Sequence, residues 1–133
     1  MVVAVTLVLG GACNKEEPAM PGEDFRPIAL SFAKALCSRD YAGAYALTSS
    51  QYRAHVTEDE MSDAFERIVP LDWGETEPVQ VGETMTDWPD KREGDVGWAY
   101  VNISGDAYSE AVVVVVARDE SGLAIRDVQW GRP

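Results

Sequence analysis

The sequence predicts an α+β domain in which three N-terminal helices pack on a curved four-stranded antiparallel sheet. Two observations lead to this prediction. Between residues 24 and 70, apolar residues recur at steps of three and four, which is the spacing of amphipathic helices. After residue 78, apolar residues alternate with polar ones or run together between turn signals, as in β-strands. Helices followed by strands are typical of the α+β class.

The size and composition of the chain indicate one folded, acidic domain. It has 133 residues, of which 46% are apolar and 26% charged, values that are ordinary for globular proteins. The net charge is −12, with 11 basic residues among 23 acidic ones. Because binding to phosphates needs clustered Lys and Arg, we expect no nucleic acid partner and no electrostatic attachment to anionic lipid headgroups.

The first two expected helices each begin after an aspartate. Asp24 is the expected N-cap of the first helix, which continues to about Arg39 and carries one apolar face. Asp40 is the expected N-cap of a short second helix, on which Tyr41 and Tyr45 share a face. The residues of the first apolar face are Phe25, Ile28, Ala29, Phe32 and Leu36.

The third expected helix begins with a capping box. Thr57 and Glu60 have the spacing at which each side chain satisfies the other residue's backbone amide. An apolar stripe follows until Pro70, whose ring cannot continue a helix. The connection before this helix is predicted to be a surface loop, and it contains His55, the only histidine of the chain.

Four strands are predicted in the second half, in the order of an antiparallel meander. They are separated by a polar loop over residues 87–95 and by turn residues at 104–106 and 119–122. The expected strands cover residues 79–85, 96–103, 111–116 and 123–130.

Two irregularities in the strand pattern predict how the sheet is built. The five consecutive valines 112–116 leave no hydrophilic face, so their strand is expected to be central and covered on both faces, or partly covered by a partner molecule. In the last strand, Leu123 and Ile125 would point to one face of a regular strand, whereas Val128 and Trp130 would point to the other. A β-bulge between the two pairs would return both to the core and curve the sheet.

The first residues have the features of an export segment. Residues 1–9 form an uncharged apolar run, which is too short to span a bilayer but suits the apolar part of a signal peptide. The following "LGGAC" resembles the lipobox of bacterial lipoproteins, which implies a signal peptide over residues 1–12 and a lipid on Cys13. Residues 13–23 have the composition of a polar linker. This resemblance implies an exported protein that is anchored to a membrane at the bacterial cell envelope. Residues 24–133 are predicted to form a single domain.

The two cysteines leave an alternative open. If Cys13 is acylated, Cys37 has no partner within the chain, and its position beside the apolar face of the first helix favours a buried small side chain. A disulfide between Cys13 and Cys37 would instead give a soluble secreted protein.

The order of three helices and a four-stranded meander resembles the nuclear transport factor 2-like superfamily, over roughly residues 24–130. The segments that carry the resemblance are "DYAGAYALTSSQYR" after the first helix and "GLAIRDVQWG" near the end of the chain. The resemblance implies a cone-shaped, cystatin-like roll, in which a curved sheet wraps around a long first helix and a pocket lies at the open end. Members include isomerases and dehydratases, small-ligand binders and domains without catalytic activity, so the resemblance does not decide the function.

No catalytic or phosphate-binding motif occurs in the sequence, and we predict no catalytic residue, metal site or cofactor. Trp98 is expected in the core, whereas Trp88, which precedes Pro89 in a loop, is the expected exposed aromatic contact. The acids of this loop, which include Asp95, are expected to be solvated rather than to bind calcium. The possible pocket or contact residues are Tyr41, Tyr45, His55, Trp88 and Trp98.

The leading functional hypothesis is therefore a non-enzymatic domain that binds a partner protein or a small ligand at the cell envelope. One alternative is a small pocket enzyme of the isomerase or dehydratase type. Another is a structural homodimer module, which the valine-rich strand suggests.

Overall fold

The computed structural model describes residues 24–105, 108–120 and 122–132. Within these ranges the chain forms four α-helices, one 3-10 helix and four strands. The signal peptide and the linker that are predicted for residues 1–12 and 13–23 lie outside the described residues. In chain order the elements are α1 Arg26–Cys37, α2 Tyr41–Ala46, α3 Ser50–His55, α4 Glu58–Ile68, η3 Leu71–Trp73, β2 Gln80–Met85, β3 Asp95–Gly105, β4 Tyr108–Asp119 and β5 Gly122–Trp130.

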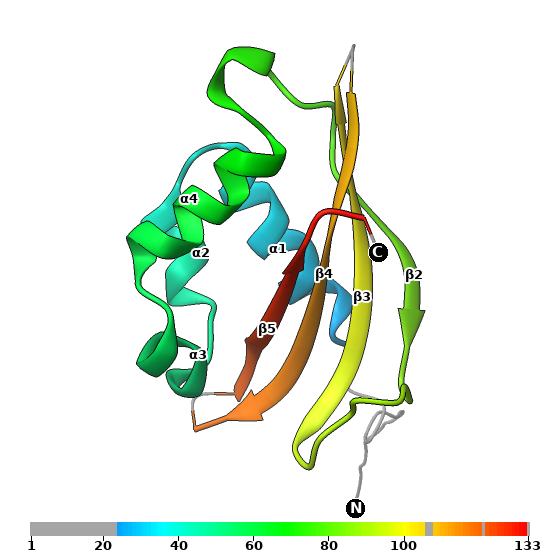
Figure 1. The fold of residues 1–133 in the computed structure, drawn as a ribbon. Coiled ribbons are helices and arrows are strands. Elements are labelled where there is room, and N and C mark those ends of the chain that lie inside the picture. The colour runs from blue at the N-terminus through cyan, green and yellow to red at the C-terminus, as the bar shows by residue number, and fades with distance from the viewer. Residues whose placement is uncertain (1–23, 106–107, 121, 133) are drawn as a thin grey trace, which may run out of the picture.

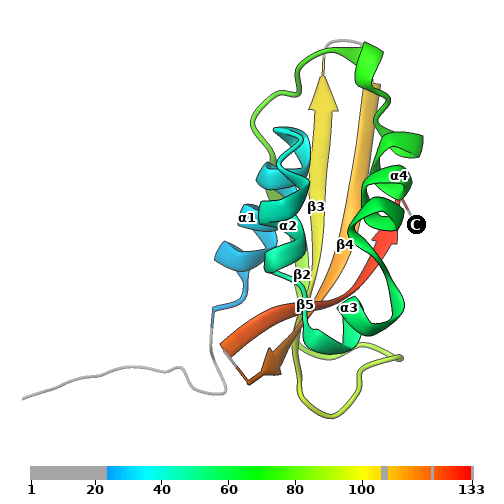
Figure 2. The same cartoon turned by 90° about the vertical axis from the view of Figure 1, so that its left-hand side faces the viewer.

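The helices and the sheet form two layers (Figure 1). The strands pair antiparallel in the order β2-β3-β4-β5. Figure 2 shows the helices lying over one face of this sheet, which we call the inner face. We call the opposite face, on which none of the described helices packs, the outer face (Figure 1). The α+β class and the four-stranded antiparallel meander are thereby confirmed.

A short helix, α3, lies where the sequence predicted a loop. Its N-cap is Ser49, whose hydroxyl accepts a hydrogen bond from the amide of Tyr52 at 3.1 Å. His55 is therefore the last residue of a helix and not part of a surface loop. The prediction of three helices was wrong because the segment of α3 is mostly polar and buries only Tyr52, so it shows no apolar spacing.

The first helix, α1, is shorter than predicted at both ends. Phe25 is its N-cap, although the carboxylate of Asp24 still accepts a hydrogen bond from the amide of Arg26 at 3.1 Å. The helix ends at Cys37 rather than at Arg39. Arg39 has a left-handed backbone with a φ angle of 62°, which is a common way for a chain to leave a helix.

The predicted caps of the next two helices are confirmed. The carboxylate of Asp40 accepts a hydrogen bond from the amide of Gly43 at 3.0 Å and so caps α2. The capping box of α4 is complete, because the Thr57 hydroxyl accepts from the Glu60 amide at 3.1 Å and the Glu60 carboxylate accepts from the Thr57 amide at 2.9 Å.

Changing Thr57 to alanine is expected to lower the free energy of unfolding by about 1 kcal/mol. The reason is that the Glu60 amide at the start of α4 loses its acceptor. Thr57→Ser keeps the hydroxyl and is expected to behave like the unmodified chain. Urea unfolding followed by circular dichroism measures both variants. Equal losses in the alanine and serine variants would contradict the capping role.

The space between the helices and the inner face is filled by apolar side chains. Phe32 and Leu36 of α1 and Phe65 of α4 are fully buried there. Phe65 also meets Trp130 of β5 edge to face, with the ring centroids 6.4 Å apart. Removing this surface from water is the main favourable contribution to folding. The other large, fully buried apolar side chains of the core are Met61, Val69, Val101, Ile103, Val112, Val114, Val116 and Ile125.

Strand β4 has the central position that its five valines predict. It lies between β3 and β5 in the sheet. Alternate valines belong to the core on the inner face, while Val113 and Val115 line a hollow on the outer face. Even there, Val113 and Val115 are only 3% and 8% exposed. The strand is thus covered on both faces, as the absence of a hydrophilic face requires.

The predicted β-bulge in the last strand is also confirmed. Val115 of β4 lies opposite Asp127, and the next residue, Val116, lies opposite Ile125. Arg126 is therefore the extra residue of β5, without a partner in the ladder. The bulge brings the apolar residues on both sides of it into contact with the core.

Candidate functional site

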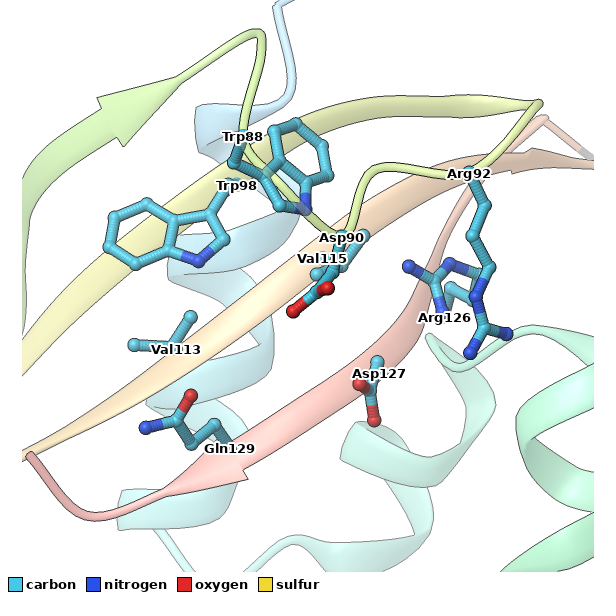
Figure 3. Close-up of a pocket in the computed structure, with 9 residues that line it drawn as sticks. All are labelled: Trp88, Asp90, Arg92, Trp98, Val113, Val115, Arg126, Asp127 and Gln129. Carbon is cyan, nitrogen blue, oxygen red and sulfur yellow. The ribbon is translucent and has the colours of Figure 1, made fainter. Parts of the chain in front are cut away.

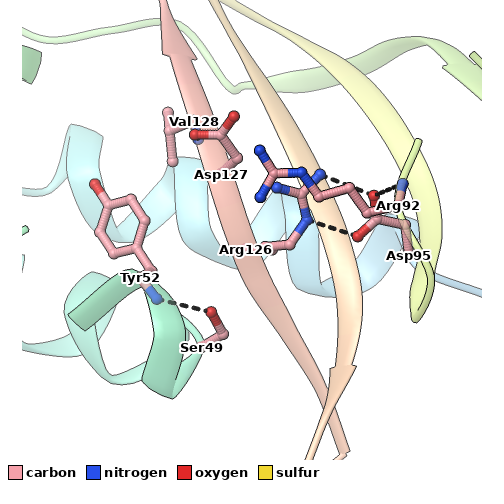
Figure 4. A network of polar contacts seen from close by, with 7 residues as sticks. All are labelled: Ser49, Tyr52, Arg92, Asp95, Arg126, Asp127 and Val128. Atoms are coloured by element: carbon pink, nitrogen blue, oxygen red, sulfur yellow. Dashed lines mark hydrogen bonds and ion pairs between the residues drawn. The ribbon is translucent and has the colours of Figure 1, made fainter. Parts of the chain in front are cut away.

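A buried ion pair joins the bulge of β5 to the start of β3 (Figure 4). Arg126 Nε donates to Asp95 Oδ1 at 2.6 Å, and Arg126 Nη2 donates to Asp95 Oδ2 at 2.8 Å, so the contact is bidentate. The side chain of Asp95 is fully buried and that of Arg126 is 10% exposed. The backbone amide of Arg92 donates to the same carboxylate at 2.8 Å. The hydrogen bonds to Asp95 raise the pKa of Arg126 above its ordinary value.

The position of Asp95 contradicts the prediction that it is a solvated loop acid. It is the first residue of β3 and is buried. No local pattern indicates this pair, because Asp95 and Arg126 are 31 residues apart and only the sheet brings them together. The sequence pointed to this region only through the predicted bulge, because a bulge often turns a side chain toward a functional site.

A hollow of about 300 Å³, which we call the outer groove, lies beside this ion pair on the outer face (Figure 3). Valines of β4 form its floor, and the loop before β3 and the strand β5 supply its sides. In Figure 3 the indoles of Trp88 and Trp98 lie at one end and the guanidinium groups of Arg92 and Arg126 at the other. Its lining consists of Trp88, Asp90, Arg92, Trp98, Val113, Val115, Arg126, Asp127 and Gln129.

A second hollow of about 300 Å³, which we call the side hollow, adjoins the outer groove. The two share Arg92, Arg126 and Asp127, and α3 adds Tyr52 and His55 to the side hollow. Burial raises the pKa of Tyr52 to about 12, and the negative charge of Asp127 contributes to the increase. The phenol of Tyr52 therefore stays protonated at neutral pH.

The structure places three of the five predicted contact residues at these two hollows. Trp88 and Trp98 line the outer groove, and His55 lines the side hollow. Tyr41 and Tyr45 line neither hollow. The Tyr41 hydroxyl donates to a carboxylate of α4 at 2.6 Å, and the Tyr45 hydroxyl donates to the carbonyl that follows α3 at 2.7 Å. These hydrogen bonds connect the helices to one another.

Both tryptophans of the outer groove differ from their predicted environments. Trp98 is half-buried on the outer side of β3, because strand alternation turns the neighbouring Ala99 into the core instead. Trp88 is only 9% exposed, and the Lys91 ammonium lies 5.7 Å from its ring centroid. In the described part of the chain, the large exposed apolar side chains are Leu71 and Trp73 of η3, at 64% and 45%.

Neither the histidine nor the described cysteine lines the outer groove. Among the described residues, no three His, Cys, Asp or Glu side chains lie together in a way that would hold a metal ion. The single histidine, His55, has its Nδ1 atom 3.0 Å from the carbonyl of Gln51. Cys37 lines a different hollow, and burial raises the pKa of its thiol, which keeps it protonated. The two residues therefore do not form a nucleophile and base pair.

The residues that sequence reasoning missed are the polar ones of the groove, above all Arg92, Arg126 and Gln129. Cys13, the predicted lipid attachment residue, lies outside the described residues. None of the helices that the structure describes is long and apolar enough to cross a membrane. The chain matches no family model, and no curated protein or solved structure matches it either.

Proposed function

We propose that this chain is an exported lipoprotein whose domain binds a partner protein or a small ligand through the outer groove and catalyses no reaction. The observation that carries this proposal is the outer groove itself. Two indoles and several polar side chains surround a hollow of about 300 Å³, next to a buried ion pair that holds its wall in place. A concave surface with apolar walls and a few convergent polar groups is the usual form of a ligand site.

The apolar packing of the inner face is a second reason to propose a site on the outer face. In the cone-shaped roll of the nuclear transport factor 2-like superfamily, which we propose as the fold family of this chain, the pocket lies inside the cone. Here Phe32, Leu36 and Phe65 fill the space between the helices and the sheet. An isomerase or dehydratase would need a pocket with convergent acid and base groups, so the packed interior favours the binding function.

The test of the outer groove is Trp98→Ala. We expect small molecules or partner proteins that bind the chain to lose affinity about tenfold or more in this variant, because truncating a buried aromatic contact removes a large part of the binding energy. A fragment screen by ligand-observed NMR measures the change. Trp73→Ala is the matched control, since Trp73 is an exposed tryptophan that does not line the groove.

Two outcomes would contradict binding at the groove: no Trp98-dependent binder, or binders whose affinity is the same in both tryptophan variants. Sedimentation at micromolar concentration examines the homodimer alternative. A dimer that dissociates in Trp98→Ala would show that the occupant of the outer face is a second copy of the chain.

The anchor is tested at Cys13. With a net charge of −12, the chain is not expected to hold to anionic headgroups by itself, so membrane attachment would need a covalent lipid. We expect Cys13→Ala to move the protein from the detergent phase to the aqueous phase when it is expressed in a bacterial host, and globomycin to block its processing. Cys37→Ala is the control and should stay in the detergent phase. A Cys13→Ala protein that still partitions with detergent would overturn the lipoprotein proposal.

A further inference from the structure

Several polar groups of the outer groove have no internal partner. In the part of the chain that the structure describes, the carboxylate of Asp90, the guanidinium of Arg92 and the amide of Gln129 make no hydrogen bond to another protein group. They come from the loop before β3 and from β5, and they lie around the same hollow (Figure 3). Together they offer a carboxylate acceptor, a guanidinium donor and an amide that does both.

The charges of the groove are mixed. Asp95 neutralises Arg126 through the buried ion pair. The charges that remain are the two carboxylates of Asp90 and Asp127 and the single guanidinium of Arg92, so the lining repels an anion. The net charge of −12 further disfavours an anion, and the Lys91 ammonium already lies over Trp88. A neutral ligand that both donates and accepts hydrogen bonds can pair with the Asp90 carboxylate, the Arg92 guanidinium and the Gln129 amide alike.

The Trp98 indole and the volume of the outer groove restrict the shape of the ligand. The indole of Trp98 is half-buried and lies along one end of the groove, where it presents a flat apolar surface (Figure 3). The volume of about 300 Å³ is small for a ligand pocket. The ligand therefore needs a flat C–H face to stack on an indole, and hydroxyl groups around its edge. A sugar ring has both.

We infer that the outer groove binds a neutral saccharide of one or two rings. The ring stacks on Trp98, and its hydroxyl groups hydrogen-bond to Asp90, Arg92 and Gln129. This inference rests on the proposed function, because it names the ligand class of the same groove. The buried Asp95–Arg126 pair positions the β5 side of the site and does not touch the sugar.

The experiment titrates the full chain with glucose, N-acetylglucosamine, maltose, cellobiose and chitobiose, and follows tryptophan fluorescence and ligand-observed NMR. At least one of these sugars is expected to bind with a dissociation constant of about 1 mM, which is usual for ligands of this size. Trp98→Ala and Asp90→Asn are expected to weaken binding about tenfold or more. Trp73→Ala and Asp72→Asn, on the exposed η3, are the matched controls and should bind like the unmodified chain.

A second arm tests the charge argument. Glucuronic acid carries a negative charge on the glucose ring and is expected to bind about tenfold more weakly than glucose, because it meets two carboxylates and one guanidinium. Trp98→Phe keeps an aromatic face and should retain part of the affinity, which guards against a Trp98→Ala variant that does not fold. The inference is overturned by the absence of binding of every neutral sugar, by unchanged binding in Trp98→Ala and Asp90→Asn, or by equal binding of glucuronic acid and glucose.

Failure of the inference can be told apart from failure of the proposed function. If the sugars do not bind but other molecules from the fragment screen bind in a Trp98-dependent way, the saccharide class is wrong and the binding groove stands. If nothing binds in a Trp98-dependent way, both fail.

Discussion

Replacing Arg126 with alanine is expected to lower the free energy of unfolding by about 3–5 kcal/mol. The carboxylate of Asp95 is fully buried and receives two hydrogen bonds from the Arg126 guanidinium. Without Arg126, the amide of Arg92 is its only remaining hydrogen-bond donor among the described residues. A buried charge without its partner cannot recover the hydration that it lost on folding, so the loss exceeds what a surface ion pair contributes.

The measurement is urea unfolding of matched variants. Arg132→Ala removes the same charge from an exposed position and is expected to change stability by less than about 0.5 kcal/mol. Asp95→Asn combined with Arg126→Met removes both charges and should be more stable than Arg126→Ala alone, because no charge is left buried and unpaired. An Arg126→Ala loss as small as that of Arg132→Ala would show that the pair is not buried in solution.

The second large effect is expected where β3 passes under the start of α1. A Cβ atom at Gly97 would overlap with the ring of Phe25, which is 7% exposed and part of the core. Gly97→Ala is therefore expected to cost about 1–3 kcal/mol, because the new methyl group overpacks a filled site. Phe25→Ala alone is expected to cost about 3 kcal/mol through the cavity that it leaves.

The two changes together should cost less than the sum of the single losses. In Phe25→Ala the ring is gone, so the methyl group of Gly97→Ala fills part of the vacated space and no longer clashes. The expected coupling is about 1 kcal/mol or more in a double-mutant cycle measured by urea unfolding. Strict additivity of the two losses would mean that the ring and Gly97 are not in contact.

Much of the fold was predictable from local patterns. The caps at Asp40 and Thr57, the end of α4 before Pro70 and the four strands depend on interactions within a few residues, which the spacing of side chains records. Even the bulge of β5 was visible, because one extra residue in a strand shifts the apolar alternation by one position. Helix α3 was missed because its stability comes from the Ser49 cap and from packing on the sheet, and not from a long apolar face.

The candidate site was less predictable than the fold. Trp88 and Trp98 were both among the predicted pocket or contact residues, and both line the outer groove. Their environments were predicted wrongly, since Trp88 is buried and Trp98 lies half-buried on the outer face. A loop residue's exposure depends on where the loop folds back, and which face of the sheet the helices cover is a property of the whole domain.

Residue order and composition alone established the class of the fold, the acidic character that disfavours nucleic acid, the central place of the valine strand and the presence of a bulge. The folded chain was needed to show that the bulged residue is Arg126, that its partner is Asp95, and that the interior is packed while the outer face is hollowed. This division follows from the range of the interactions. Caps and apolar spacing act between near neighbours in the chain, whereas an ion pair across 31 residues and a groove built from a loop and three strands exist only after the sheet has formed.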